Sequence, residues 1–218
     1  MVTLPFILSS IAADLEREVF EIELAFEACS HHDSITGFNT TYGAGEDGCV
    51  VSLWDAWNRF MRALILTSCA GPFEGASGHL YTPPNVFIES AALLELKKAA
   101  KKTNIKVVRT EPNWYDSLAT ADFCSALSLP NAAVITSAVQ SSQIVDFTGA
   151  IVPNPLSEVR KMRNYIAHKN HLTFSDITAL GLSSNDPRAF ISQIVTGGTS
   201  RFTEWTTGLI AVANAAVN

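Results

Sequence analysis

Charged residues are scarce in this chain of 218 residues: they make up 17% of it, whereas hydrophobic residues make up 47%. This composition argues against a disordered chain and favours a large buried core. The four cysteines form no Cys-x-x-Cys pair, so reduced thiols in the cytoplasm are expected. No apolar run is long enough to span a bilayer, and the apolar start of the chain lacks the basic segment of a signal peptide.

Recognisable cofactor and metal motifs are also missing. The glycine-rich stretch from about 36 to 48 lacks the Gly-Lys-Ser/Thr ending of a phosphate-binding loop, so it is interpreted as a surface loop. Cys29, His31, His32 and Asp33 are metal-binding residue types, but their spacing fits no zinc pattern, and a polar helix end is the preferred interpretation. We therefore expect neither a metal nor a cofactor.

Apolar residues recur at helical spacing through most of the chain, which predicts one all-α domain over residues 1–218. The expected fold is a helical bundle with long loops and at most one or two short extended segments. Residues 105–108 are either extended or a turn, and residues 131–150 stay ambiguous. Helices are expected near residues 10–28, from Ser52 onward, 85–102, 118–127, 154–170, 175–180, after Pro187, and 199–216.

Positive charge gathers in the middle of an otherwise acidic chain. The net charge is −6, yet residues 97–169 contain ten basic and five acidic residues, against five basic and sixteen acidic elsewhere. This distribution is typical of a protein that binds an anionic ligand locally. The competing interpretation is that the lysines from 97 to 102 are simply a solvated helix face.

The stretch from Glu158 to Asn170 is the only place where basic, amide and imidazole groups crowd onto one predicted helix. Asn154 is a suitable cap for this helix, and Pro155 is tolerated in its first turn. Asn170 and the Thr173-x-x-Asp176 pattern predict that a new helix begins soon afterwards, which places His168 near a helix C-terminus.

The spacing within this stretch limits what one helix can assemble. Asn164 and His168 are four residues apart and share a face. Arg163 precedes His168 by five residues, which is roughly 140° around an ideal helix, so these two side chains do not stack. A curled Arg163 side chain, a frayed last turn, or a two-fold partner helix could complete the site.

Arg163-Asn164-Tyr165-Ile166-Ala167-His168 resembles the R-x4–6-H motif of the HEPN superfamily, in its ribonuclease-type members. Two upstream segments, 57–60 (Trp-Asn-Arg-Phe) and 111–114 (Glu-Pro-Asn-Trp), are similar to the RiboL-PSP-like branch. The resemblance implies a HEPN-type bundle and a homodimer in which two motif helices face each other across one cleft. It also implies RNA as substrate and service in a toxin–antitoxin or phage-defence setting, with a possible antitoxin or defence partner protein.

The residue types suit RNA cleavage without a metal. His168 can act as general base or acid, and the helix C-terminus, which favours the protonated imidazole, points to an acid or mixed role. Arg163 can hold two phosphoryl oxygens in the transition state. Asn164 could orient the imidazole or a phosphate, whereas Tyr165 is expected to pack rather than stack on a base. The expected RNA contacts are Arg160, Lys161 and Lys169.

Three functions therefore compete. The first is a metal-independent endoribonuclease, which the presence of Arg163, Asn164 and His168 favours. The second is a catalytically silent HEPN module that binds RNA, nucleotide or a partner protein, in keeping with the overall acidity. The third is a helical enzyme of unrelated chemistry that uses the glycine-rich segment. The competing interpretation of the motif itself is a surface arginine and a histidine that caps the helix.

Overall fold

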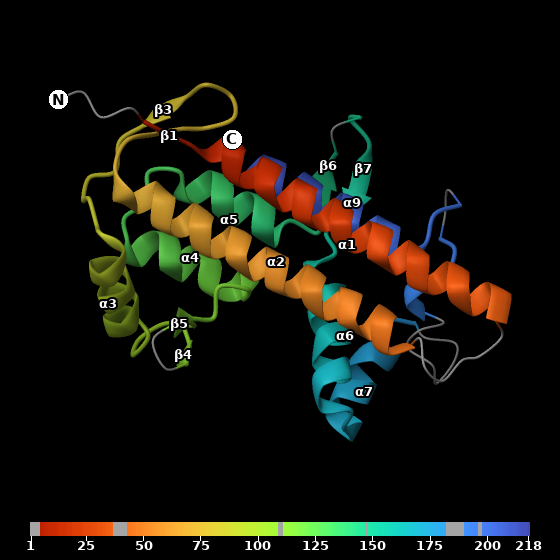
Figure 1. The fold of residues 1–218 in the computed structure, drawn as a ribbon. Coiled ribbons are helices and arrows are strands. Elements are labelled where there is room, and N and C mark those ends of the chain that lie inside the picture. The colour runs from red at the N-terminus through yellow and green to blue at the C-terminus, as the bar shows by residue number, and fades with distance from the viewer. Residues whose placement is uncertain (1–4, 37–42, 109–110, 147, 182–189, 196–197) are drawn as a thin grey trace.

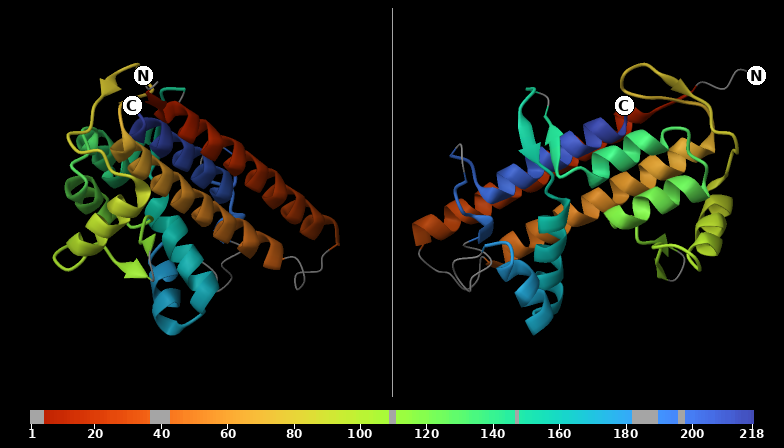
Figure 2. Two further views of the ribbon diagram at one scale, coloured as in Figure 1. Left: turned by 60° about the vertical axis from the view of Figure 1, so that its left-hand side comes forward. Right: turned by 180° about the vertical axis from the view of Figure 1, so that it is seen from behind.

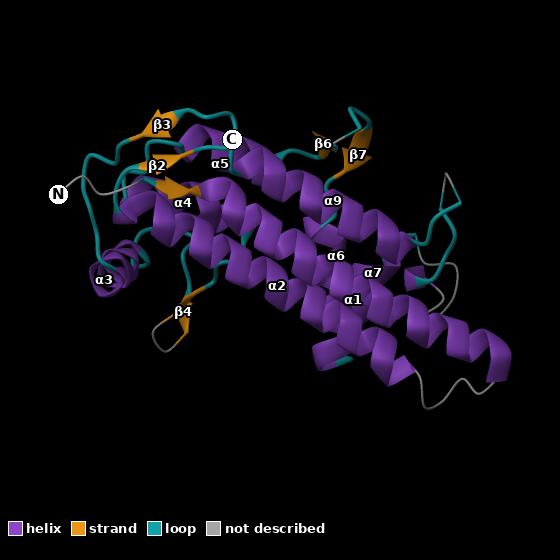
Figure 3. Ribbon diagram, turned by 45° about the horizontal axis from the view of Figure 1, so that its top comes forward, coloured by secondary structure: helices purple, strands orange, loops and turns teal. Residues whose placement is uncertain are grey.

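The computed structural model describes residues 5–36, 43–108, 111–146, 148–181, 190–195 and 198–218, with the side chains of 30–36 and 43–44 outside that description. Helices dominate these residues, as predicted (Figure 3). The helices are α1 (Leu8–Thr36), α2 (Gly43–Ala70), α3 (Glu89–Ala99), α4 (Ser117–Ala126), α5 (Ala132–Gln140), α6 (Leu156–His168), α7 (His171–Thr178) and α9 (Arg201–Ala216). None of these described helices combines the length and apolar character needed to cross a membrane.

The two longest helices, α1 and α2, lie antiparallel and form the front layer of the molecule in Figure 1. Behind them, α9 packs on α1 and on α5, and α5 packs on α4 (Figures 1 and 2). One hydrophobic core fills the space between the layers. Trp57 and Trp205 are buried there, and the rings of Phe26 and Phe202 stack with centroids 4.1 Å apart. The core therefore joins the N-terminal hairpin of helices to the C-terminal helix.

More extended structure is present than the sequence predicts. The described residues contain seven strands of two or three residues, so the expectation of at most one or two extended segments was wrong. They form a three-stranded sheet of β1 (Phe6–Ile7), β2 (Phe73–Glu74) and β3 (Leu80–Tyr81), and two hairpins, β4 (Val107–Val108) with β5 (Glu111–Pro112) and β6 (Gln143–Val145) with β7 (Ile151–Pro153). Because β1 pairs in parallel with β2, far away in sequence, no local pattern announces this sheet.

The largest error of prediction concerns the start of the second helix. Ser52 does not cap α2 but lies inside it, and residues 43–48 of the predicted loop are helical. Tertiary packing explains this outcome, because a Cβ at Gly45 would come within 2.6 Å of Cys29 Sγ on α1. Glycine thus allows the two helices to approach closely here, and that gain outweighs the poor helix propensity of glycine.

Other helix boundaries shift by smaller amounts. The third helix begins at Glu89 rather than Asn85, and the ambiguous region 131–150 contains both α5 and β6. Helix α7 begins four residues earlier than predicted, at His171, because Asn170 and Thr173 form a capping box. Of the helix expected after Pro187, residues 188 and 189 lie outside the described residues, and the described residues 190 and 191 are helical.

Candidate functional site

The first half of α6 is anchored firmly to the bundle. Leu156, Val159 and Met162 form its buried face, and the helix packs against α2. Asn154 links it to the end of α5: its Oδ1 accepts a hydrogen bond from Leu156 N (3.1 Å) while its Nδ2 donates to Ser141 O (2.8 Å). The N-cap position of α6 is Pro155 rather than the predicted Asn154, and the Asn154 side chain reaches the first helical N–H, that of Leu156, from one residue before the cap.

Glu158 adds a second anchor from the opposite side of α6. Its carboxylate accepts a hydrogen bond from Trp205 Nε1 at 2.9 Å and lies 3.6 Å from the Arg201 guanidinium, both on α9. Arg201 also lies over the ring of Phe190, with 4.7 Å between its Cζ and the ring centroid. The start of the motif helix is therefore held by contacts from two other helices.

The second half of α6 projects away from the bundle together with α7, and the views in Figures 1 and 2 agree on this arrangement. Lys169 adopts a left-handed conformation (φ 43°, ψ 44°) that ends α6, and its N–H donates to Tyr165 O at 2.8 Å. The capping box of α7 follows at once. Tyr165 packs on Phe174 of α7, with 6.0 Å between ring centroids. This short connection fixes His168 at the exposed end of a helical hairpin.

Arg163 lies half-buried where the projecting part of α6 leaves the bundle. Its Nε is buried without a hydrogen-bond partner, and its Nη1 lies 3.5 Å from Asn164 Oδ1. Across the described residues, no carboxylate lies within ion-pair distance of Arg163. A half-buried guanidinium without a counter-charge is electrostatically costly, so this position favours the binding of an anion.

The neighbouring cations differ from Arg163 in this respect. Arg160 Nη1 lies 3.9 Å from Asp116 Oδ1, and Lys169 Nζ lies 3.9 Å from Asp47 Oδ2. Lys161 is half-exposed and has no ion pair in the part of the chain that the structure describes. Of the predicted RNA contacts, Lys161 thus carries the more available charge, whereas Arg160 and Lys169 are partly neutralised.

Arg163 and His168 are not brought together within one chain. Helix α6 is regular from Leu156 to His168, so the angular offset expected from their spacing is retained. Asn164, which was expected to orient the imidazole or a phosphate, contacts Arg163 instead. No hydrogen bond among the described residues involves the side chain of His168. The imidazole is therefore exposed and unoriented in the isolated chain.

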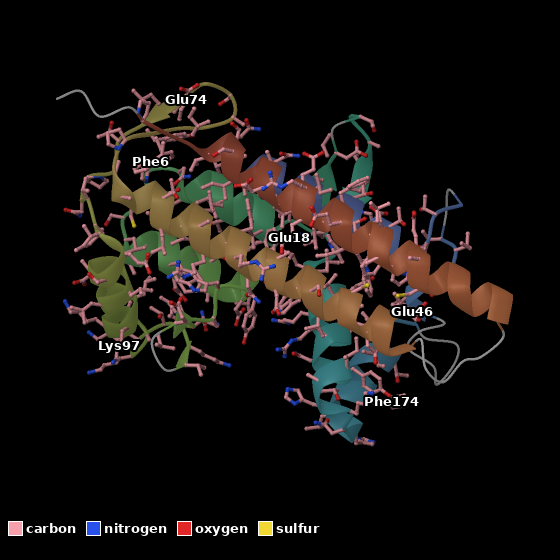
Figure 4. All side chains as sticks on the ribbon, in the orientation of Figure 1. Phe6, Glu18, Glu46, Glu74, Lys97 and Phe174 are labelled. Atoms are coloured by element: carbon pink, nitrogen blue, oxygen red, sulfur yellow. The ribbon has the colours of Figure 1, made fainter. Side chains whose placement is uncertain are left out.

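The lysines of the basic middle belong to a different surface. Lys97 and Lys98 on α3, with Lys101 and Lys102 just after it, are all exposed. Helix α3 lies at the opposite end of α2 from α6, as the label of Lys97 in Figure 4 shows. These lysines form the solvated helix face that was the competing interpretation, and Arg109 lies outside the described residues. The basic stretch of the sequence does not form one continuous patch near His168.

The second helix, which contains segment 57–60, is linked to segment 111–114 by Arg62, a residue that the sequence did not single out. Arg62, not Arg59, binds Glu111, with 3.2 Å between Nε and Oε2, and Trp114 Nε1 donates to the same oxygen at 2.9 Å. Burial raises the pKa of Glu111, but the hydrogen bonds from Arg62 and Trp114 outweigh it and hold the pKa below its ordinary value. Arg59 instead forms an ion pair with Glu18 of α1.

The aromatic residues of the second helix pack as predicted, since Trp54 and Trp57 are both buried. Trp54 also meets Tyr115, with 5.4 Å between ring centroids, which places the loop before α4 against α2. Asp116 in that loop caps α4 by accepting a hydrogen bond from Leu118 N and faces Arg160. Asp116 precedes the helix predicted at Leu118, so its position as a cap was the signal that could have identified it.

The arrangement offers a guanidinium without a counter-charge among the described residues and an exposed imidazole. Within the described residues, no group of three or more His, Cys, Asp or Glu side chains is placed to hold a metal ion. The side chains of His31, His32 and Asp33 lie outside those residues. No protein-family model, curated protein or solved structure shows a match to this chain, so functional inference rests on the geometry of α6 and its surroundings.

Proposed function

We propose that this protein is a metal-independent endoribonuclease of the HEPN type, acting as a homodimer. The observation that carries the proposal is the pairing, on one rigid helix, of a half-buried Arg163 that lacks a counter-charge with an exposed His168. An RNA phosphate would supply the missing negative charge. The cytoplasmic setting of toxin–antitoxin or phage defence belongs to the same proposal and rests on the motif resemblance.

The reaction needs a general base, a general acid and a group that stabilises the phosphoryl oxygens, and the site offers side chains for each role. A base removes the proton of the 2′-hydroxyl, which attacks the adjacent phosphorus, and an acid gives a proton to the departing 5′-oxygen. Imidazole performs both roles near neutral pH, so one His168 would take the proton of the 2′-hydroxyl and then give it to the 5′-oxygen as the bond from that oxygen to phosphorus breaks. Arg163 stabilises the phosphoryl oxygens as they gain charge, and Lys161 adds a phosphate contact.

A dimer resolves the separation of Arg163 and His168 on the helix. The α6–α7 hairpin projects from the bundle and is free to meet a second copy about a two-fold axis (Figure 2). Leu172 at the tip of this hairpin has 75% of its surface exposed, which supplies an apolar contact beside His168. In such a pair, His168 of one copy would approach Arg163 of the other.

The deciding experiment compares the wild type with three variants on a mixed RNA substrate at low salt with EDTA. His168→Ala should lose cleavage and remain folded, because this exposed side chain contributes little packing. Arg163→Lys keeps the charge but loses the two-pronged grip, so its rate should fall by about 100-fold or more. His171→Ala removes another exposed histidine three residues away and serves as the matched control, with cleavage expected to stay at the wild-type rate.

Two outcomes would contradict this mechanism. Equal cleavage by the wild type and His168→Ala would remove the imidazole from the reaction. Cleavage that disappears with EDTA and returns with Mg²⁺ or Mn²⁺ would show that a metal, rather than the Arg163 guanidinium, stabilises the transition state.

A second candidate is a catalytically silent module that binds RNA, nucleotide or a partner protein. The unoriented imidazole of His168 favours it, because a general base or acid works best when a neighbour fixes its ring. This function predicts no cleavage by the wild type. It also predicts that Arg163→Ala weakens RNA binding while His168→Ala leaves it unchanged, as measured by fluorescence anisotropy.

A further inference from the structure

Two adjoining hollows form a groove between α1 and α2. No described element lies in front of these two helices in Figure 1. One hollow of about 490 Å³ is lined by Ile11, Leu15, Phe60 and Ala63, and an adjoining hollow of about 300 Å³ shares Glu18, Glu21 and Arg59 with it. Figure 4 shows Glu18 lying between the two helices on this face. The lined part of α1 runs from Ile11 to Ala25, which is about 21 Å at 1.5 Å per residue.

The shape and lining of this groove suit an α-helix. Ala25, Ser52, Ala56 and Ala63 contribute small side chains from the two helices, so the backbone of a bound helix could approach closely. A ligand helix of about 14 residues with one apolar face would cover this floor.

The charges around the groove determine which helix would bind. Arg17 and Arg59 are already paired, Arg17 with Asp14 at 2.8 Å and Arg59 with Glu18. Glu21 and Asp55 also line the groove, and no ion pair of the described residues involves either of them. Residues 8–28 contain six acidic side chains and one basic side chain, so the same face of a second copy would be repelled.

From this geometry we propose that the α1–α2 groove binds a basic amphipathic helix of another protein. Its apolar face packs on the groove floor, and its lysine or arginine side chains pair with Glu21 and Asp55. The groove is lined by residues of α1 and α2, and the projecting α6–α7 hairpin contributes none, so the proposal does not depend on RNA cleavage.

The test uses the full chain and a fluorescein-labelled 16-residue peptide of leucine, alanine and lysine with one apolar face. A peptide of identical composition, reordered so that leucine surrounds the helix, controls for charge alone. Glu21→Lys/Asp55→Lys should weaken binding of the first peptide at least about tenfold, because attraction becomes repulsion. Glu16→Lys/Glu27→Lys makes the same charge change on exposed α1 positions outside the groove and should change affinity by less than about threefold.

Ala25→Trp is an independent variant that fills the groove without changing charge, and it should also weaken binding about tenfold. Circular dichroism confirms that each variant is folded. The proposal is wrong if both peptides bind equally well, or if the groove and control variants lose affinity equally. It is also wrong if sedimentation shows a dimer that Ala25→Trp dissociates, because the occupant would then be a second copy of this chain.

Discussion

Arg163 and Arg160 are three residues apart on α6 but have opposite electrostatic surroundings. Asp116 lies near Arg160, whereas the Nε of Arg163 is buried without a partner. The difference arises from the loop before α4, which carries Asp116 to one side of α6 only. An anionic ligand would therefore gain more from Arg163 than from its neighbour, since it need not displace a carboxylate.

The buried thiols are expected to be chemically inert in the native protein. Burial, the largest cause, raises the pKa of Cys49 and Cys69 to about 11 and that of Cys124 to about 12. The thiolate is the reactive form, and at pH 8 a thiol of pKa 11 is ionised to about one part in a thousand. Iodoacetamide at pH 8 should thus label these three cysteines only after unfolding in urea, which exposes the sulfur atoms and removes the burial that raises their pKa.

Peptide mass spectrometry of the alkylated protein measures this protection site by site. Cys29, which is half-exposed, is the internal comparison and should be labelled in the native state. Rapid native labelling of Cys69 or Cys124 at pH 8 would show that the core around them is open, contrary to the packing described above.

Helix α6 is placed by a close approach between α9 and the segment that precedes it. A Cβ on Gly208 of α9 would lie 2.8 Å from Pro155 Cδ and 2.9 Å from Pro153 O. Backbone atoms cannot move aside cheaply, so only glycine fits without displacing the start of α6. The position of Arg163 and His168 therefore depends on a glycine in another helix.

Gly208→Ala should destabilise the protein by about 1–3 kcal/mol, the usual cost of overpacking a core. The matched control is Gly48→Ala on α2, where a new Cβ would meet nothing within 4 Å. That change removes a glycine from an exposed helix interior and should stabilise by about 0.5–1 kcal/mol. Urea unfolding midpoints measure both effects, and equal shifts in the two variants would contradict the packing argument.

The projection of α6 and α7 from the bundle leaves the predicted catalytic pair incomplete in one chain. Two chains related by a two-fold axis would create two composite sites, each with Arg163 from one copy and His168 from the other. This arrangement makes a prediction that a single-chain site does not share.

Arg163→Ala and His168→Ala should each be inactive alone but regain activity when mixed and allowed to exchange subunits. Random exchange makes half of the dimers mixed, and each mixed dimer has one intact site of two, so about one quarter of wild-type activity should return. Cleavage of a labelled RNA by the mixture measures this recovery. A mixture that remains as inactive as its components, despite exchange shown by mass spectrometry, would place both groups in the same chain or outside the reaction.

Local sequence patterns predicted the helical elements better than the contacts between them. Asn170 and Ser200 each cap a helix by accepting a hydrogen bond from a backbone N–H three residues later. Because these contacts are local, the starts of both helices could be recognised or closely approximated from the sequence. The start of α2 could not, because Gly45 lies close against Cys29 of another helix, and no local pattern of residues specifies that contact. The motif residues were identifiable by spacing, but Asp116, Asp47 and Arg62 were missed because they approach their partners from distant segments.

The sequence by itself determined the helical class, the buried faces of α2 and α6, and the exposed lysines of α3, since periodicity and capping depend on residues a few positions apart. Only the tertiary structure decided which cations remain without a counter-charge. It also decided that the α3 lysines lie away from His168, and that the α1–α2 groove remains open. These properties depend on which distant segments come into contact. Such contacts are determined by the packing of the whole core rather than by any one stretch of the sequence.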